Sequence, residues 1–422
     1  MLDPILTPSS PNDIAAAARR LREHAAVAYG TEPLKIIEIL DRWGAALRGP
    51  VADAIPGVAF LRLWLRRNSL EPMLRRELGY EALLGSWREE SRARLGIFPL
   101  GLVGHWPAGN IDIQPVLSMS CALLGGNACL VRVPSGLVDV TRVLATRLHE
   151  ADADGVLTDR ITFVAFDHDR LDLHRAMASA VDGAMVWGGA EAVAEVRALP
   201  FPHWARVAVF GPRLSVAAMD GGAWSDEANR PNWCRRLARD VWQFDQQACS
   251  SPQTLFLEHR DGCDIQPFVD ALKQAFVEEN QAHPRHDIHP ALTSAITLAR
   301  ASWLLECETR RAAFPPAPDW TILVGDGSDI PTPIQGRTLT VLLVDDLLEA
   351  VSKFSGKVQT LGVAMTDCDR EAELARAAAR NGVDRIVKLG RMHVFGSPWD
   401  GTDLVRPMTR VIRYVPSSET TV

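Results

Sequence analysis

Lysine is scarce in this chain. Only five of its 45 basic residues are lysines, at positions 35, 273, 353, 357 and 388. Because no lysine lies between Lys35 and Lys273, more than half of the chain cannot hold a P-loop lysine or a lysine that forms a Schiff base. The excess of arginine is most simply a codon bias. The net charge of −7 does not suggest a general nucleic-acid binder, so no nucleic-acid partner is expected.

The chain also lacks the cysteine pairs and apolar segments of exported or membrane proteins. Its seven cysteines form no CxxC pair, and their odd number fits a reducing compartment better than a disulfide framework or a zinc site. The N-terminus shows no basic region followed by an apolar core. The longest uncharged stretch, 113–131, is interrupted by Gln, Ser, Gly and Asn, whereas a membrane span needs about 20 mostly apolar residues. We therefore expect a cytoplasmic protein with no metal and no membrane span.

The apolar pattern predicts two α/β domains. Helical spacing runs through residues 11–90. From about residue 97, short apolar runs alternate with helical patterns, as in βαβ units around a parallel sheet. Gly, Pro and Asp cluster at 211–223, where we expect the domains to join. The alternating segment 409–415 is typical of an edge strand.

The segment GLVGHWPAGNIDI (101–113) places Asn110 between a predicted strand and a predicted helix. Ligands in α/β folds bind at the carboxyl ends of strands. Asn110 could aim its amide at a developing oxyanion, but the local sequence favours a helix N-cap, for which Asn is strongly preferred.

The segment WQFDQQACSSPQTLFLE (242–258) places Cys249 between a predicted helix and a predicted strand, among small polar residues. Free cysteines are commonly inert and buried, and this context alone still favours that interpretation. A nucleophilic thiolate, in contrast, needs partial access and nearby dipoles, which this junction offers.

Two further strand ends carry turns. VRVPSGLVDV (131–140) runs from a strand into a polar turn, and MVWGGAEAV (185–193) runs through two glycines into a helix. A glycine turn lets backbone amides approach a phosphate, although a tight turn with no ligand explains each equally well. Neither matches the GxGxxG dinucleotide fingerprint.

Taken together and in this order, these segments resemble the aldehyde dehydrogenase superfamily, and more closely its LuxC-type branch of acyl-CoA reductases. The most specific match is DQQACSSPQ around Cys249, followed by PLGLVGHWPAGN and LLGGNACLVRVPS; VQTLGV (358–363) and PWDG (398–401) are weaker features. The resemblance covers roughly 95–415. It implies an aldehyde-dehydrogenase-like α/β fold, with a Rossmann-type cofactor domain, an α/β catalytic domain and a helical N-terminal segment.

The resemblance also implies domain boundaries and assembly. We expect a helical segment at 1–94 packed on the cofactor domain, a dinucleotide-binding domain at 95–215, a catalytic domain at 216–405 and a C-terminal strand and tail at 406–422. Because members of the family often form dimers or tetramers, a homodimer or homotetramer is expected, and the segment 409–415 is a candidate to add a strand to a partner.

Site residues follow from the same resemblance. Cys249 matches the family nucleophile, and Asn110 matches the residue that, with the backbone amide at the cysteine, stabilises the oxyanion in a cleft between the domains. A helix terminus or His105 could lower the pKa of Cys249, although His105 more simply packs at its strand end. The cofactor-binding positions carried over are Trp106, Pro107, Arg132, Pro134, Ser135, Trp187, Gly188, Gly189, Phe210 and Gly211.

One departure from the family pattern concerns the reaction. Family members that form acids carry a Glu just before the double glycine that reads Phe210-Gly211-Pro212 here. The segment 204–219 contains no carboxylate, so hydrolysis of a thioacyl-enzyme should be slow. The intermediate would instead exchange with a thiol or accept hydride, which is the chemistry of a thioester reductase.

Two departures concern the cofactor. Many NAD-using relatives carry Lys-Pro-Ser-Glu where this chain reads Arg132-Val133-Pro134-Ser135-Gly136. No acid repels a 2′-phosphate there, and Arg132 can pair with one if its side chain faces the site instead of pointing away. NADPH is therefore favoured over NADH. The Glu that holds the nicotinamide ribose in relatives is also missing, because the corresponding run appears as Pro333-Ile334-Gln335-Gly336-Arg337.

The sequence thus predicts NADPH-dependent reduction of an acyl thioester, carried by coenzyme A or a carrier protein, to an aldehyde through a thioacyl-enzyme on Cys249. Three alternatives stay open: an aldehyde dehydrogenase, either CoA-acylating or oxidising; a cysteine acyltransferase without hydride transfer; and a catalytically silent subunit that scaffolds a pathway.

Overall fold

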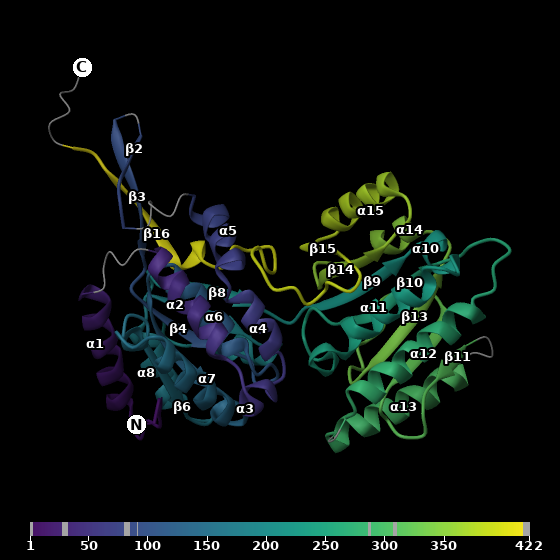
Figure 1. Cartoon of the computed structure of the whole chain (residues 1–422), viewed down its shortest axis with the longest axis horizontal. Helices are drawn as coiled ribbons and strands as arrows, with labels where there is room; N and C mark the ends of the chain where they lie inside the picture. The colour runs from purple at the N-terminus through teal and green to yellow at the C-terminus, as the bar shows by residue number, and fades with distance from the viewer. Residues whose placement is uncertain are drawn as a thin grey trace. The chain divides into compact units, whose positions relative to one another are not determined.

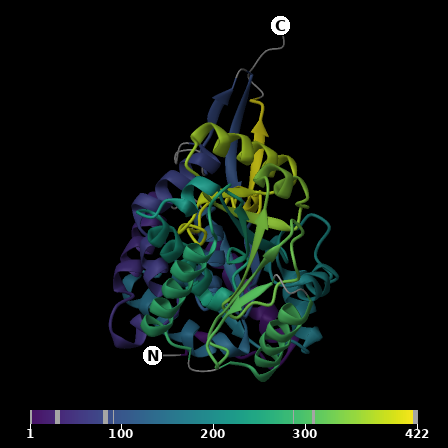
Figure 2. The same cartoon turned by 90° about the vertical axis from the view of Figure 1, so that its right-hand side faces the viewer.

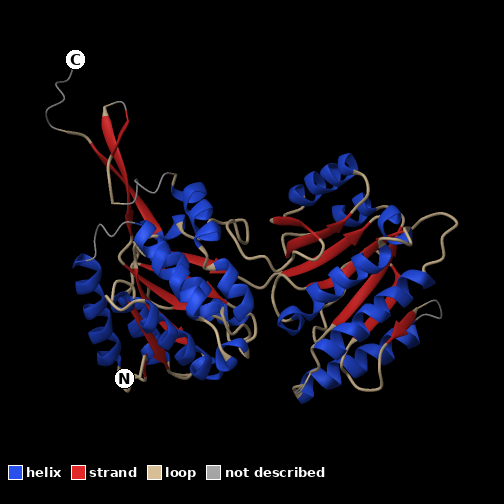
Figure 3. Cartoon of the chain, viewed as in Figure 1, coloured by secondary structure: helices blue, strands red, loops and turns tan. Residues whose placement is uncertain are grey.

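A computed structural model describes residues 3–27, 33–79, 85–90, 92–285, 288–306 and 310–416. The chain divides into two compact units. The first unit comprises Met1–Gly211 with Gly396–Val422, and the second comprises Pro212–Phe395. In each unit, helices cover a mainly parallel sheet (Figures 1 and 3). The fold class expected from the sequence is therefore confirmed.

The first unit is built on a six-stranded sheet in which all neighbouring strands run parallel. Its order is β1 (Ile5–Leu6), β6 (Ile161–Ala165), β5 (Ala128–Val133), β4 (Leu102–Trp106), β7 (Gly183–Trp187) and β8 (Arg206–Phe210). Strands β4 and β7 are buried along their whole length, as expected for parallel strands covered on both faces.

Helices from the N-terminal segment pack on the other helices of this unit. Helix α1 packs on α8, and α2 packs on α6 and α7, where the Trp43 indole donates to the Leu144 carbonyl at 3.0 Å. The helices of the unit are α1 (Pro11–Val27), α2 (Pro33–Ala46), α3 (Pro50–Asp53), α4 (Val58–Trp64), α5 (Arg67–Leu78), α6 (Gln114–Leu124), α7 (Val138–Ala151), α8 (Leu171–Ala180) and α9 (Ala190–Arg197), with 3₁₀ turns at Ser135–Leu137, Thr158–Arg160 and Arg406–Met408.

A three-stranded antiparallel sheet joins the C-terminal strand to the N-terminal segment. Its order is β16 (Thr409–Tyr414), β3 (Ala93–Pro99) and β2 (Arg88–Glu90). Figures 1 and 2 both show yellow β16 alongside blue β3. The strand expected at 409–415 thus pairs with this chain's own β3. Strand β2 lies where the sequence predicted helix. Its three residues are all exposed and carry no apolar period, so the local pattern gave no sign of a strand.

The second unit is built on a seven-stranded sheet, parallel except for its first strand, which runs antiparallel to its neighbour. Its order is β11 (Arg311–Ala313), β12 (Thr321–Asp326), β13 (Thr338–Val344), β10 (Pro252–Glu258), β9 (Leu214–Met219), β14 (Val358–Ala364) and β15 (Arg385–Lys388). Its helices are α10 (Gly221–Ser225), α11 (Arg230–Trp242), α12 (Gln266–Ala282), α13 (Pro290–Glu306), α14 (Leu347–Ser352) and α15 (Cys368–Arg380), with a 3₁₀ turn at Gln243–Gln246.

Strand β9 corrects the expected join at 211–223. The units do part after Gly211, but residues 214–219 form a buried inner strand of the second sheet. Glycine, proline and aspartate flank this six-residue run, which is apolar except for Ser215, and do not interrupt it. A short run of this kind is typical of a strand buried on both faces, and the turn residues around it concealed the pattern.

A buried carboxylate ties α5 to the C-terminal segment. The fully buried Glu77 side chain accepts backbone N–H groups of Leu404, Val405 and Arg406 at 3.0, 2.7 and 2.7 Å. We expect Glu77→Ala to lower the free energy of unfolding by about 3 kcal/mol, because it leaves buried donors unpaired. Chemical denaturation measures this loss. Exposed Glu38→Ala is the control, and equal stability of the two variants would contradict the prediction.

Candidate functional site

Cys249 lies in a turn immediately before β10, an inner strand of the second sheet. It is half-buried, whereas Cys121, Cys129 and Cys234 are buried and Cys263 and Cys368 are exposed. Burial raises the pKa of Cys234 to about 12, so that thiol stays protonated. Cys307 lies outside the described residues. Cys249 thus combines partial access with a fixed position, as a nucleophilic thiol requires.

The backbone of the Cys249 turn is fixed from the neighbouring strand. The Ser215 hydroxyl on β9 donates to the Cys249 carbonyl at 2.7 Å, and Ser215 is fully buried. Within the turn, the Ser251 N–H donates to the Ala248 carbonyl at 2.9 Å. Sequence reasoning missed Ser215, since it belongs to the strand that was interpreted as a join.

A left-handed turn precedes Cys249, where the sequence predicted the end of a helix. Phe244, Asp245 and Gln246 have φ values of 54°, 54° and 62°, which non-glycine residues rarely adopt and which cost of order 1–3 kcal/mol each. A second such turn spans Gln335, Gly336 and Arg337.

Side-chain contacts hold these two turns together. Asp245 is paired with Arg285 at 2.7 Å and with Arg337 at 2.6 Å. The buried Gln246 amide donates to the carbonyls of Pro252 and Thr338, both at 2.9 Å, and accepts the Thr338 N–H at 2.7 Å. These contacts offset the backbone cost and set the direction in which the chain enters the Cys249 turn. They also show that Arg337, in the run that lacks the ribose-binding Glu, is engaged in internal packing.

Asn110 lies in the loop between β4 and α6 of the first unit, and its side chain is exposed. Helix α6 begins at Gln114 and its N-cap position is Ile113, with no side-chain cap. The N-cap interpretation of Asn110 is therefore wrong. The loop is shaped instead by the Gln114 side chain, which accepts the Ala108 N–H at 2.7 Å.

The ten expected cofactor positions gather at one edge of the first sheet. They lie at or just after the carboxyl ends of β5, β4, β7 and β8, which are consecutive neighbours in the sheet. Their loops come close: a Cβ added to Gly109 would lie 3.4 Å from the Pro134 side chain. Gly189, which precedes α9, has open space where a Cβ would lie, and no side chain caps α9. The first amides of α9 are thus suited to an anion.

Two buried tryptophans lie at this edge of the sheet. Trp106 is buried and donates to His174 Nδ1 at 3.0 Å, while burial and the charge of Arg132 lower the pKa of His174 to about 4. Trp187 is buried, stacks on Phe210 at 3.8 Å and donates to the Ser118 hydroxyl at 2.9 Å. Both indole N–H groups therefore already have partners within the protein.

Arg132, the penultimate residue of β5, is half-buried. Its guanidinium lies 5.6 Å from the Phe166 ring centroid, and desolvation lowers its pKa although the charge of Asp167 opposes the shift. The buried Arg132 Nε has no hydrogen-bond partner among the described residues. A partly desolvated cation with a spare donor at this edge suits a phosphate.

His105 cannot act on a ligand from its place in β4. It is fully buried and hydrogen-bonded to Ser118 at 2.8 Å, and burial lowers its pKa to about 3. The interpretation of His105 as a packing residue is therefore favoured over a role in thiol activation.

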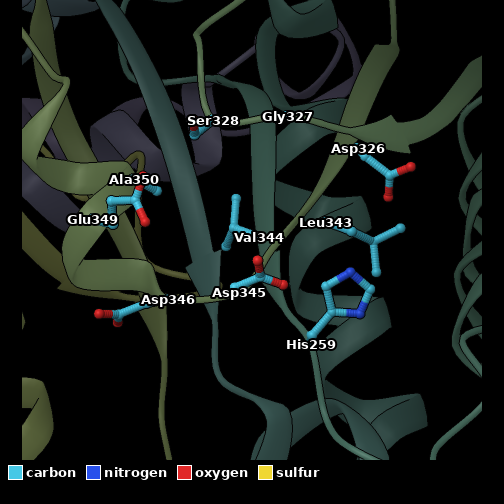
Figure 4. A pocket seen from close by; sticks show the side chains of 10 residues that line it. All are labelled: His259, Asp326, Gly327, Ser328, Leu343, Val344, Asp345, Asp346, Glu349 and Ala350. Carbon is cyan, nitrogen blue, oxygen red and sulfur yellow. The ribbon is translucent and has the colours of Figure 1, made fainter.

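A cavity of about 350 Å³ opens at the carboxyl ends of β12 and β13 (Figure 4). Carboxylates of Asp326, Asp345, Asp346 and Glu349 line it. It also borders His259, which lies just past the carboxyl end of β10. Cys249 precedes the amino end of the same strand. At 3.3 Å per residue, the length of β10 separates Cys249 from His259 by about 20 Å. Because carboxylates repel phosphates, the cavity does not suit a nucleotide.

The part of the chain that the structure describes shows neither a metal-binding cluster nor a membrane-spanning helix. In residues 3–27, 33–79, 85–90, 92–285, 288–306 and 310–416, no group of three or more His, Cys, Asp or Glu side chains is placed to hold a metal ion. Within the same ranges, no helix has the length and apolar character to cross a membrane.

Comparison with known families shows which family the chain belongs to. The model of the family described as "Acyl-CoA reductase (LuxC)" matches residues 47–414. The chain belongs to this LuxC family. It is therefore an oxidoreductase of the acyl-CoA reductase class, and the resemblance inferred from its motifs is confirmed.

Curated relatives of this LuxC-family chain are thioester reductases. The long-chain acyl-protein thioester reductase 2 of Photobacterium leiognathi is 23% identical over 362 residues, covering 84% of this chain and 73% of the relative. The long-chain acyl-protein thioester reductase of Aliivibrio fischeri is 23% identical over 350 residues, covering 83% and 70%.

Solved structures with the same fold are aldehyde dehydrogenases and related enzymes. An NADP-dependent enzyme of Escherichia coli aligns with a TM-score of 0.71 at 14% identity, covering 96% of this chain and 90% of that one. A glyceraldehyde-3-phosphate dehydrogenase of Methanocaldococcus jannaschii, complexed with NADP, aligns with a TM-score of 0.70 at 12% identity, covering 98% and 96%. These alignments establish the aldehyde-dehydrogenase-like fold of the LuxC-family chain.

Proposed function

We propose that this LuxC-family protein reduces an acyl thioester to an aldehyde with NADPH, through a thioacyl-enzyme on Cys249. The observation that carries the proposal is the Cys249 turn. It holds a half-buried thiol at the start of an inner strand, clamped by Ser215 and entered through a left-handed turn. Such strained backbone, held by many contacts, is concentrated at functional sites.

The cofactor assignment rests on the carboxyl edge of the first sheet. The uncapped start of α9, the open space at Gly189 and the spare Arg132 donor together suit a dinucleotide that carries a 2′-phosphate. Trp106, Pro107, Pro134, Ser135, Trp187, Gly188, Phe210 and Gly211 complete the proposed binding edge. When bound, NADPH supplies the hydride that reduces the thioacyl carbon.

The remaining steps belong to the chain's own residues. The Cys249 thiolate attacks the thioester carbonyl, and the Asn110 amide, with the backbone N–H at Cys249, donates to the oxyanion. The oxyanion collapses and the thiol of the donor leaves, so the acyl group is now bound to Sγ. After reduction, the thiohemiacetal collapses to aldehyde and releases the Cys249 thiolate.

A missing group argues against release of a free acid. Segment 204–219 contains no Asp or Glu, so no carboxylate there activates water against the thioacyl-enzyme. The names of the curated relatives favour an acyl-protein thioester, and the family description an acyl-CoA, as the acyl donor.

One assay tests the proposal. Purified protein is mixed with acyl-CoA or acyl-protein thioesters of several chain lengths, NADPH consumption is followed by absorbance, and aldehyde is quantified. Thioester-dependent oxidation of NADPH with equimolar aldehyde supports the proposal. Acyl transfer to Cys249 without NADPH consumption would indicate a transferase. Formation of free acid would indicate that water hydrolyses the thioacyl-enzyme, as in an acid-forming aldehyde dehydrogenase.

The assignment of Arg132 makes a separate prediction. Arg132→Glu should raise the Michaelis constant for NADPH by about 10-fold or more, because a carboxylate replaces the cation expected to pair with the 2′-phosphate. The constant for NADH should change less, since NADH lacks that phosphate. Exposed Arg410→Glu on β16 makes the same charge change as a control. Equal effects on NADPH and NADH would contradict the phosphate role.

A further inference from the structure

A half-buried imidazole lies next to the Cys249 turn. His393, in the segment that follows β15, lies with Nδ1 3.0 Å from the Ser250 hydroxyl. Its Nε2 lies 2.7 Å from the backbone carbonyl of Asp240 at the end of α11. Ser250 follows Cys249 directly and is itself 3% exposed. One chain of contacts thus runs from α11 to the residue next to the thiol.

The direction of each hydrogen bond in this chain follows from chemistry. A backbone carbonyl only accepts, so His393 Nε2 carries a proton and donates to Asp240. Burial lowers the pKa of His393 to about 4, so the ring is neutral near pH 7 and its Nδ1 has no proton. Nδ1 therefore accepts, and the Ser250 hydroxyl donates to it. Because the chain ends on a carbonyl that cannot take up a proton, it is not a proton relay.

The imidazole is itself firmly held. The buried Asp240 carboxylate accepts the Gly390 N–H at 2.5 Å and the Met392 N–H at 3.3 Å, which ties the segment before His393 to α11. Phe244, the first residue of the left-handed turn, packs against the His393 ring with centroids 5.6 Å apart. The ring is thus fixed by α11 and by the backbone that leads into the Cys249 turn.

We propose that His393 is a positioning residue of the reductase, which orients Cys249 by holding the hydroxyl of Ser250. Ser215, on strand β9, holds the Cys249 carbonyl at 2.7 Å. The peptide on the carboxyl side of Cys249 is therefore held at both ends. This fixes the turn amides and the position of the Cα–Cβ bond from which Sγ extends. This inference rests on the proposed role of Cys249 as nucleophile.

The test is a double-mutant cycle on the acylation step. Ser250→Ala and His393→Leu should each lower kcat and the single-turnover rate of acylation by about 10-fold to 100-fold, because small misplacements of reacting groups carry penalties of that size. The Michaelis constant for NADPH should not change. If His393 acts through Ser250, the double variant should be no slower than the slower single variant.

A matched variant separates orientation from general loss of packing. His393→Asn places a carbonyl oxygen near the position of Nδ1, so it should recover part of the acylation rate lost in His393→Leu. Ser250→Ala removes only one oxygen and breaks the same hydrogen bond. It therefore tests the inference even if His393→Leu does not fold. Thermal unfolding of each variant checks the fold.

The outcomes distinguish this inference from the proposed function. If Ser250→Ala keeps the wild-type rate of acylation, or if the rate losses of the two single variants multiply in the double variant, the role of His393 is overturned. In either case Cys249→Ala should still be inactive. Full turnover by Cys249→Ala would instead overturn the proposed function itself.

Discussion

Replacing Cys249 with alanine should abolish aldehyde formation, with a loss of roughly 10⁴-fold or more in kcat, as for other enzymes that lose a covalent nucleophile. No other described cysteine offers a substitute in the same setting, because the others are either fully buried or exposed. The loss should appear with every acyl chain length, since it removes the atom that accepts the acyl group. NADPH consumption and aldehyde formation measure it.

Direct detection of the intermediate makes this prediction sharper. When NADPH is omitted and thioester is added, the intact mass of the wild-type protein should increase by one acyl group, and the mass of Cys249→Ala should not. Exposed Cys263→Ala and Cys368→Ala are matched controls that should keep full activity and still acquire the acyl group. An acyl group on Cys249→Ala, or turnover near the wild-type rate, would contradict a thioacyl-enzyme at this position.

The second large effect is expected at Asn110. Asn110→Ala should lower kcat by about 10²-fold to 10³-fold, the range seen when one oxyanion donor is removed. The Michaelis constant for the thioester should change little, since the bond to the amide strengthens only as charge develops on the oxygen. Steady-state kinetics with acyl-CoA or an acyl-protein thioester test both parts.

The structure makes the Asn110 prediction specific. Asn110 is exposed and does not cap α6, so alanine should not incur the roughly 1 kcal/mol cost of a lost N-cap. Gln114→Ala removes the side chain that shapes the loop and serves as the comparison. If the loss of free energy of unfolding in Asn110→Ala is large enough to explain its loss of kcat, the oxyanion role fails. Asn110→Asp should be no better than alanine, because a carboxylate repels the oxyanion.

Much of the fold could be predicted from local pattern. Strands β5, β7 and β13 lie in the region where the sequence alternates short apolar runs with helical patterns, since buried parallel strands are nearly continuous in apolar residues. Strand β9 was missed because turn-forming residues flank it closely. The turn at Phe244–Gln246 was also missed: none of its residues is glycine, and its left-handed backbone depends on Asp245 and Gln246 contacts from residues 40 and 92 positions away.

The candidate site likewise contains residues that the sequence could identify and residues that it could not. Cys249, Asn110 and the glycine turns could be found from the sequence, because their motifs are contiguous and follow the order of a known family. The residues that hold Cys249 could not be found that way. Ser215 is 34 positions away and His393 is 143 positions from Ser250, and neither belongs to a motif.

By itself, the sequence determined the family, the alternating α/β order and the identity of the proposed nucleophile, since these depend on residue type and local spacing. Only the tertiary structure decided that Asn110 is not a helix cap, that Arg337 is used internally and that Ser215 and His393 flank the Cys249 turn. Those features depend on hydrogen bonds and ion pairs between distant segments. A hydroxyl, an imidazole or a guanidinium has no assigned partner until packing brings one within about 3 Å.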